Sequence, residues 1–212
     1  MTTDYSYVCP GCGAQLTAPF PSGINVRTDP RLKDAVRDGS LFVAECPYCG
    51  RRNLLKGQLL YHDPDERLMI WLLPDGDPAE ARLEAIESQL EGLEGYTFRR
   101  VPDAGTLIEK VNIHDAGLDD RVMEMCKYVT RMELAESRKD PSLMDISLKF
   151  FRMDGPDNQI TLTYPRDGKM EGLEIGFNVY EDCRGILARN PAIQAGPGFA
   201  RVDADWIGRY FR

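Results

Sequence analysis

Four of the six cysteines lie in two matching motifs whose residue types and spacing suit a metal ion. Cys9-Pro10-Gly11-Cys12-Gly13 is the first and Cys46-Pro47-Tyr48-Cys49-Gly50 is the second, so both have the pattern C-P-x-C-G. Two residues between the cysteines let both thiolates of a tight turn face one ion. The glycine after each pair permits a positive φ, which turns backbone N–H groups toward sulfur. The motifs together predict one Zn²⁺ bound by Cys9, Cys12, Cys46 and Cys49.

Four cysteinates around Zn²⁺ leave no open coordination position, so the predicted site is structural and does not activate water. A disulfide framework fits poorly with a chain that has no export signal, and a thioredoxin-like motif needs only one C-x-x-C. Iron stays an open alternative, because four thiolates also hold iron. The two other cysteines, Cys126 and Cys183, are expected to be buried core thiols.

The elements that position these ligands are predicted to form a zinc ribbon with an insertion. The two motifs are separated by residues 13–45, which is longer than the roughly 15–20 residues usual between such pairs. Extended segments enter and leave each motif, and residues 53–62 are expected to form one long strand leading out of the second. A short helix over 31–37 is indicated inside the insertion by Asp29 at its N-cap and Pro30 at its first position.

The chain resembles a known family in the duplicated C-P-x-C motif, the Tyr61-His62-Asp63 run and the segment Leu107–Val111. On these features it is similar to the CpXC domain family of bacteria and archaea. The resemblance covers about residues 5–135, and the cysteine pairs are its specific part. It implies metal binding at the four cysteines of the motifs and implies no particular activity.

The rest of the chain predicts an α+β body. Apolar spacings of three and four residues indicate helices over 78–92 and 116–137, with a brief helix over 106–111. Alternating apolar residues from Ile146 to Val179 then indicate a C-terminal antiparallel meander of three strands, followed by a short terminal helix. The predicted fold class is therefore α+β, with domains at 1–62 (the ribbon) and 63–212 (the body); packing of the two as one unit is an open alternative.

Charge argues against two classes of partner. The chain of 212 residues has 26 Lys and Arg against 34 Asp and Glu, a formal charge of −8. Nucleic-acid or anionic-membrane binding by the whole surface would need a basic protein. The acidity is concentrated in residues 63–103, which hold eleven acidic and four basic residues, so the ribbon itself is close to neutral. Arg51, Arg52 and Lys56 beside the second motif are candidate nucleic-acid or anion contacts, although a solvated loop is the favoured interpretation.

A second, catalytic site would require the only two histidines to converge with carboxylates. His62 is followed by Asp63, and His114 by Asp115, but no spaced motif such as H-E-x-x-H connects them. Turn and helix-end roles explain most of these carboxylates. A hydrolase with a His/carboxylate pocket is therefore the alternative and not the first hypothesis.

The sequence thus favours a non-enzymatic zinc-binding protein with a protein-interaction, self-association or assembly role. The chain has no apolar run approaching the roughly 20 residues that span a membrane, and its first residues do not have a signal-peptide pattern. We therefore expect a cytoplasmic location. Weak nucleic-acid binding through the ribbon is a further alternative.

Overall fold

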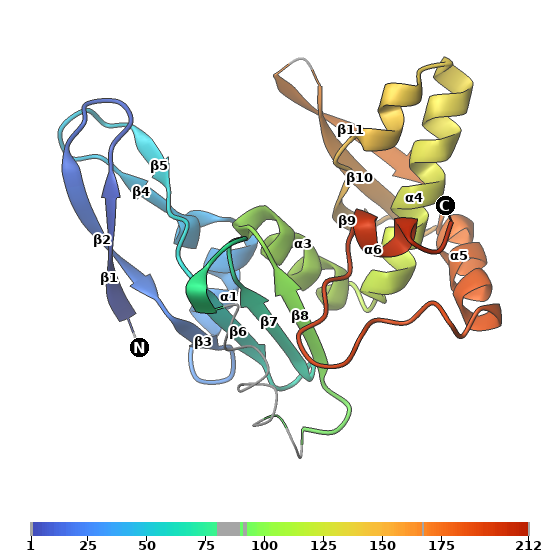
Figure 1. The fold of residues 1–212 in the computed structure, drawn as a ribbon, viewed down its shortest axis with the longest axis horizontal. Coiled ribbons are helices and arrows are strands. Elements are labelled where there is room, and N and C mark those ends of the chain that lie inside the picture. The colour runs from blue at the N-terminus through green and yellow to red at the C-terminus, as the bar shows by residue number, and fades with distance from the viewer. Residues whose placement is uncertain (1, 80–89, 91–92, 167, 212) are drawn as a thin grey trace. The chain divides into compact units, whose positions relative to one another are not determined.

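The computed structural model describes residues 2–79, 90, 93–166 and 168–211. These residues form an α+β fold, as predicted, and separate into two compact units (Figure 1). Unit 1 comprises Met1–Ile108 and Pro197–Ala200, and unit 2 comprises Glu109–Gly196 and Arg201–Arg212. No helix in the described part of the chain is long and apolar enough to cross a membrane.

Two antiparallel hairpins carry the cysteine motifs in unit 1. Strand β1 (Thr2–Val8) pairs with β2 (Gln15–Pro21), and β4 (Val43–Glu45) pairs with β5 (Arg52–Leu54). The first motif connects β1 to β2 and the second connects β4 to β5, so each motif is the turn of its own hairpin (Figure 1). A strand therefore enters and leaves each motif, as predicted, although the strand leaving the second motif is shorter than expected.

Unit 1 also contains a four-stranded mixed sheet with the strand order β3-β6-β7-β8. Its strands are β3 (Gly23–Asn25), β6 (Leu59–Asp63), β7 (Leu68–Leu72) and β8 (Thr97–Val101). The central pair β6–β7 is antiparallel, while β3–β6 and β7–β8 are parallel. Because β6 ends at Asp63, the sheet crosses the predicted boundary at 62/63, and an independent module over 1–62 stays a prediction.

The single strand expected over residues 53–62 is wrong, because the structure divides it into β5 and β6. The break contains Gly57, where a side-chain carbon would lie 2.6 Å from the ring of Phe20. The bare backbone at Gly57 therefore lets the Phe20 ring pack against the chain and ends the strand pairing there.

The insertion between the motifs contains the predicted helix. Helix α1 (Pro30–Arg37) has Asp29 at its N-cap and proline in its first turn. Gly39 follows with φ +77°, a conformation that glycine adopts without strain, and a 3₁₀ turn η1 (Ser40–Phe42) leads into β4. The helix predicted over 78–92 lies outside the described residues, apart from residues 78, 79 and 90.

Residues Pro197–Ala200, near the end of the sequence, pack with unit 1. Phe199 packs edge-on against Trp71 and Phe98, with ring centroids 5.5 Å apart in both pairs. Ala200 forms a parallel bridge to Arg99 at the edge of β8. Residues 197–200 are therefore part of the core of unit 1 although they lie near the end of the sequence.

Unit 2 packs helices against a three-stranded antiparallel sheet of β9 (Lys149–Asp154), β10 (Gln159–Arg166) and β11 (Lys169–Ile175). The strand order β11-β10-β9 confirms the predicted C-terminal meander. Its core joins residues from the sheet and from the helices, among them Met123, Ile160 and Ile207. Helix α3 begins in unit 1 and continues into unit 2, and it is longer than the brief helix expected over 106–111. The elements in chain order are α3 (Ala104–Asp115), α4 (Asp120–Arg138), η4 (Pro141–Asp145), β9 (Lys149–Asp154), β10 (Gln159–Arg166), β11 (Lys169–Ile175), α5 (Phe177–Arg189) and α6 (Ala204–Gly208).

The third strand of the meander does not extend to Val179, as the alternation predicted. Strand β11 ends at Ile175, Gly176 caps the next element, and α5 begins at Phe177. The helix buries Tyr180 and Cys183, which are three residues apart and lie on one helical face.

Candidate metal centre

The four cysteines of the motifs converge at the turns of the two hairpins. All four Sγ atoms lie within 4.8 Å of one another, with Cys9–Cys49 at 3.7 Å and Cys12–Cys46 at 3.6 Å. A disulfide would need about 2.05 Å. Four sulfurs placed tetrahedrally at about 2.3 Å from one ion are about 3.8 Å apart. These two separations are therefore those of ligands around an ion and not of bonded sulfurs.

The two motifs have the same backbone hydrogen bonds. In the first, Gly13 N–H donates to the carbonyl of Cys9 at 2.8 Å, and Cys9 N–H donates to the carbonyl of Ala14 at 2.9 Å. The second motif repeats both bonds at the same sequence spacing, at 2.9 Å and 2.8 Å. Gly13 and Gly50 have φ of +74° and +68°, which confirms the predicted role of these glycines.

The second hairpin leaves no room for a side chain at Gly11, the variable position of the first C-P-x-C-G motif. A side-chain carbon on Gly11 would lie 2.9 Å from Cδ of Arg51 and 3.3 Å from Sγ of Cys49. The aliphatic part of Arg51 therefore packs on the first motif. The equivalent position of the second motif is Tyr48, whose side chain is 75% exposed, so no such constraint acts there.

The four thiols differ in burial and in hydrogen bonding, and these differences shift their pKa values in opposite directions. Cys9 and Cys46 are buried, whereas Cys12 and Cys49 are exposed. Burial alone would raise the pKa of Cys9, but N–H donation from Gly11 and Cys12 and contacts with the thiols of Cys46 and Cys49 lower it to about 6. Donation from the N–H of Arg51 lowers the pKa of Cys49, but its contacts with Cys46, Cys9 and Cys12 outweigh this and raise it to about 12. Four adjacent thiols do not all ionise unaided, and a divalent cation would supply the compensating charge.

The two histidines lie in different units. His62 is on β6 in unit 1, with its Nε2 3.2 Å from Oη of Tyr96, and burial lowers its pKa. His114 is near the end of α3, in unit 2. Asp63, beside His62, binds Nζ of Lys33 at 2.9 Å. Within the described part of the chain, the four cysteines are the only group of three or more Cys, His, Asp and Glu whose ligand atoms are close enough for one ion.

The candidate anion contacts follow the second motif along the chain. Arg51, Arg52 and Lys56 are all exposed, and none of them forms an ion pair with the other described residues. Tyr48 is exposed in the same motif. These positions leave the cations accessible to an anion, and that contact stays a prediction.

A second charged cluster, in unit 2, was not predicted from the sequence. Glu109, Lys110, Asp120, Glu124 and Lys127 are each at least 96% buried. Two signals could have indicated it. Glu109 and Lys110 are adjacent within the apolar segment Leu107–Val111, and the three residues that α4 contributes to the cluster have helical spacings of four and three.

Comparison with known families gives one match. A family model described as CpXC protein matches residues 7–127, from β1 through both cysteine motifs and into α4. Neither the curated proteins nor the solved structures gave a match.

Proposed function

The chain belongs to the CpXC protein family, and from this premise we propose that it is a metal-binding protein with one structural Zn²⁺. The observation that carries the proposal is the convergence of the four Sγ atoms within 4.8 Å of one another. In a four-thiolate site every coordination position is occupied by protein, so the ion holds the chain and does not bind substrate.

The size of the hairpins supports a structural role for the ion. Strands β4 and β5 have three residues each, and an isolated two-stranded hairpin is marginally stable at best. A tetrathiolate ion would join this hairpin to β1–β2 and supply the stability that so small an apolar core cannot. In this proposal the two hairpins are a zinc ribbon, and the segment from β3 to η1 belongs to its insertion.

Cobalt substitution tests the coordination directly. The protein, depleted of metal under reducing conditions, would be titrated with Co²⁺ and followed by visible absorption. A tetrahedral four-thiolate site predicts intense d–d bands, a thiolate-to-cobalt charge-transfer band and saturation at one Co²⁺ per chain. Weak octahedral bands, or no saturation, would overturn the proposal. Iron bound by the protein as purified would show its own visible absorption, whereas zinc would show none.

We further propose a protein-interaction or self-association role in the cytoplasm, whose reducing conditions keep thiolates available. Three large apolar side chains, Val8, Tyr48 and Leu54, are 58% or more exposed on the hairpins that carry the site. Apolar side chains gathered near one site favour a protein partner or a second copy. Light scattering across a range of concentrations tests self-association: a mass above 23.9 kDa that V8S/Y48S/L54S abolishes without metal loss would support it. A monomer at all concentrations would exclude self-association.

Weak nucleic-acid binding is the second candidate, because the exposed ring of Tyr48 lies within four residues of the exposed Arg51 and Arg52. An aromatic ring and nearby cations suit a single strand, which stacks its bases and presents phosphates. Fluorescence anisotropy with a labelled single-stranded oligonucleotide tests it: R51A/R52A should weaken binding and reduce its salt dependence.

The hydrolase alternative is weaker, since neither histidine belongs to a close ligand group among the described residues.

A further inference from the structure

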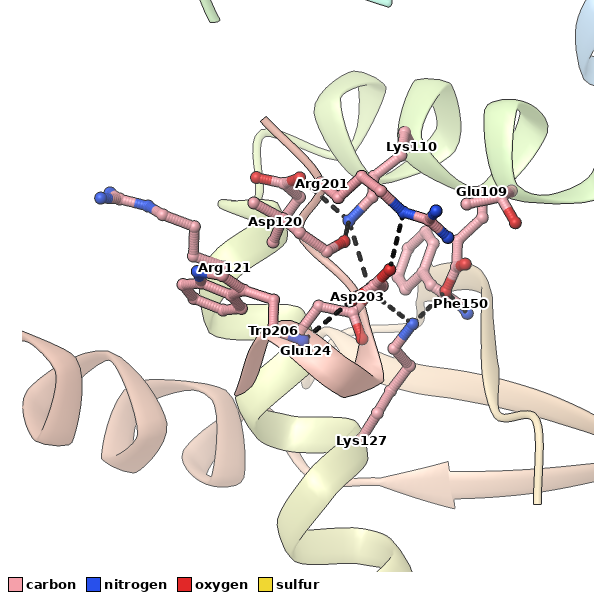
Figure 2. Close-up of polar contacts among 12 residues, drawn as sticks. Glu109, Lys110, Asp120, Arg121, Glu124, Lys127, Phe150, Arg201, Asp203 and Trp206 are labelled. Atoms are coloured by element: carbon pink, nitrogen blue, oxygen red, sulfur yellow. Dashed lines mark hydrogen bonds and ion pairs between the residues drawn. The ribbon is translucent and has the colours of Figure 1, made fainter. Parts of the chain in front are cut away.

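The buried cluster of unit 2 forms one continuous ionic network, which we define as Glu109 and Lys110 of α3 with Asp120, Glu124 and Lys127 of α4. Figure 2 shows its two lysines approaching from different helices with carboxylates between them. Glu124 Oε1 lies 3.3 Å from Nζ of Lys110 and 2.7 Å from Nζ of Lys127, so it joins the two halves of the network.

The Lys127 half ends on the sheet. Nζ of Lys127 lies 2.8 Å from Oε1 of Glu109, and the same oxygen accepts from the backbone N–H of Phe150 on β9 at 2.8 Å. The partly exposed Lys149 adds a third cation, 3.5 Å from the other oxygen of Glu109. Each of the three carboxylates of the network therefore lies within 3.5 Å of at least one ammonium group.

The Lys110 half ends on the C-terminal segment. Nζ of Lys110 lies 2.9 Å from Asp120 Oδ2 and donates to the backbone carbonyl of Val202 at 2.7 Å. With Glu124, its three N–H donors have three acceptors, so this buried ammonium is fully satisfied. Val202 lies outside the residues matched by the family model, whereas all five network residues lie inside them.

Apolar contacts alone do not specify how this segment docks. Val202, Trp206 and Ile207 are buried in the core of unit 2, and their burial is favourable but non-directional. A hydrogen bond from a buried, fully partnered ammonium is directional. A shift of the segment by one residue would take the Val202 carbonyl away from Lys110.

We infer that the ionic network is a conformational device that fixes the C-terminal segment Arg201–Ile207 in one docked register, with Lys110 as the positioning residue. Replacing a buried ion pair with apolar residues often leaves stability unchanged or raises it. The effect expected here is therefore on the order of the segment and not on overall stability.

The two halves of the network offer a matched pair of variants. K110M/D120N and K127M/E109Q each remove one buried ammonium and one buried carboxylate, from pairs separated by 2.9 Å and 2.8 Å. Only the first removes a contact with the C-terminal segment. Hydrogen exchange of the whole protein, followed on the amides of residues 202–207, separates the two.

The inference predicts that these amides exchange about tenfold faster in K110M/D120N than in K127M/E109Q, while the amides of β10 are equally protected in both. Equal protection of residues 202–207 in the two variants, or a loss spread evenly over unit 2, would overturn it. If K110M/D120N does not fold, K110Q/D120N and K127Q/E109Q repeat the comparison, since glutamine retains a polar N–H donor. Failure of K110Q/D120N to fold, while its control folds, would also contradict a role confined to the segment.

Discussion

At the residue scale, burial and grouping separate the six cysteines into two classes. Cys126 and Cys183 are buried in the core of unit 2, as predicted, whereas the other four converge in unit 1. We expect Cys9→Ser to lose the bound metal, because three thiolates and a hydroxyl bind zinc far less tightly than four thiolates.

Cys126→Ser is the matched control for this prediction. It removes a thiol of the same chain without changing the candidate ligands, so its metal content should equal that of the wild type by elemental analysis. Equal metal loss in both variants would show that the loss follows from general destabilisation.

The charge state of Glu109 predicts how unit 2 responds to acid. Burial alone would raise the pKa of Glu109, but Lys127, Lys149 and Lys110 lower it below its ordinary value. Its contribution to stability is therefore fully present above the ordinary carboxyl pKa of about 4.3, and is lost as the pH falls through the lowered value.

Glu109→Gln should lower the free energy of unfolding by about 3 kcal/mol at pH 7, because it weakens the compensation of the buried Lys127. The difference from wild type should shrink as the pH falls below the ordinary carboxyl pKa of about 4.3, because acid then protonates this carboxyl in the unfolded chain before it does so in the folded protein. Denaturant unfolding, followed by the fluorescence of Trp206 in a W71F background, measures both. A difference that is constant with pH would contradict this role of the carboxylate.

At the element scale, the turns of the two hairpins depend on a left-handed backbone. Gly13 has φ +74°, and a side-chain carbon there would have nothing within 4 Å. Gly13→Ala should therefore cost about 1–2 kcal/mol through backbone strain alone. Gly13→Asn should cost less, because asparagine tolerates this conformation. Thermal unfolding of the metal-bound protein compares the two, and equal losses would argue against backbone strain as the cause.

The elements with strong local signals were predicted in kind, although α4 begins at Asp120 and not at residue 116. Proline and aspartate at the start of α1 and the apolar stripe of α4 depend only on neighbouring residues. The start of α5 was missed because Phe177 and Val179 also continue the alternation of β11. The sheet order β3-β6-β7-β8 and the bond from Lys110 to Val202 join distant parts of the chain, and periodicity contains no information about such pairings.

At the scale of the whole molecule, the structure predicts that metal removal acts on one unit. The candidate ligands all lie in unit 1, and unit 2 has its own apolar core. Treatment with a chelator under reducing conditions should speed amide exchange in β1, β2, β4 and β5 and leave β9–β11 protected. Equal loss of protection in both units would contradict a local role for the ion.

The central claim is that Cys9, Cys12, Cys46 and Cys49 together hold one metal ion. Elemental analysis combined with native mass spectrometry of the purified protein tests it most directly, because it gives the identity of the metal and its number per chain. We predict one zinc per chain in the wild type and in Cys126→Ser, and none in Cys9→Ser or Cys46→Ser. A metal-free wild type, or full metal retention in both ligand variants, would contradict the claim.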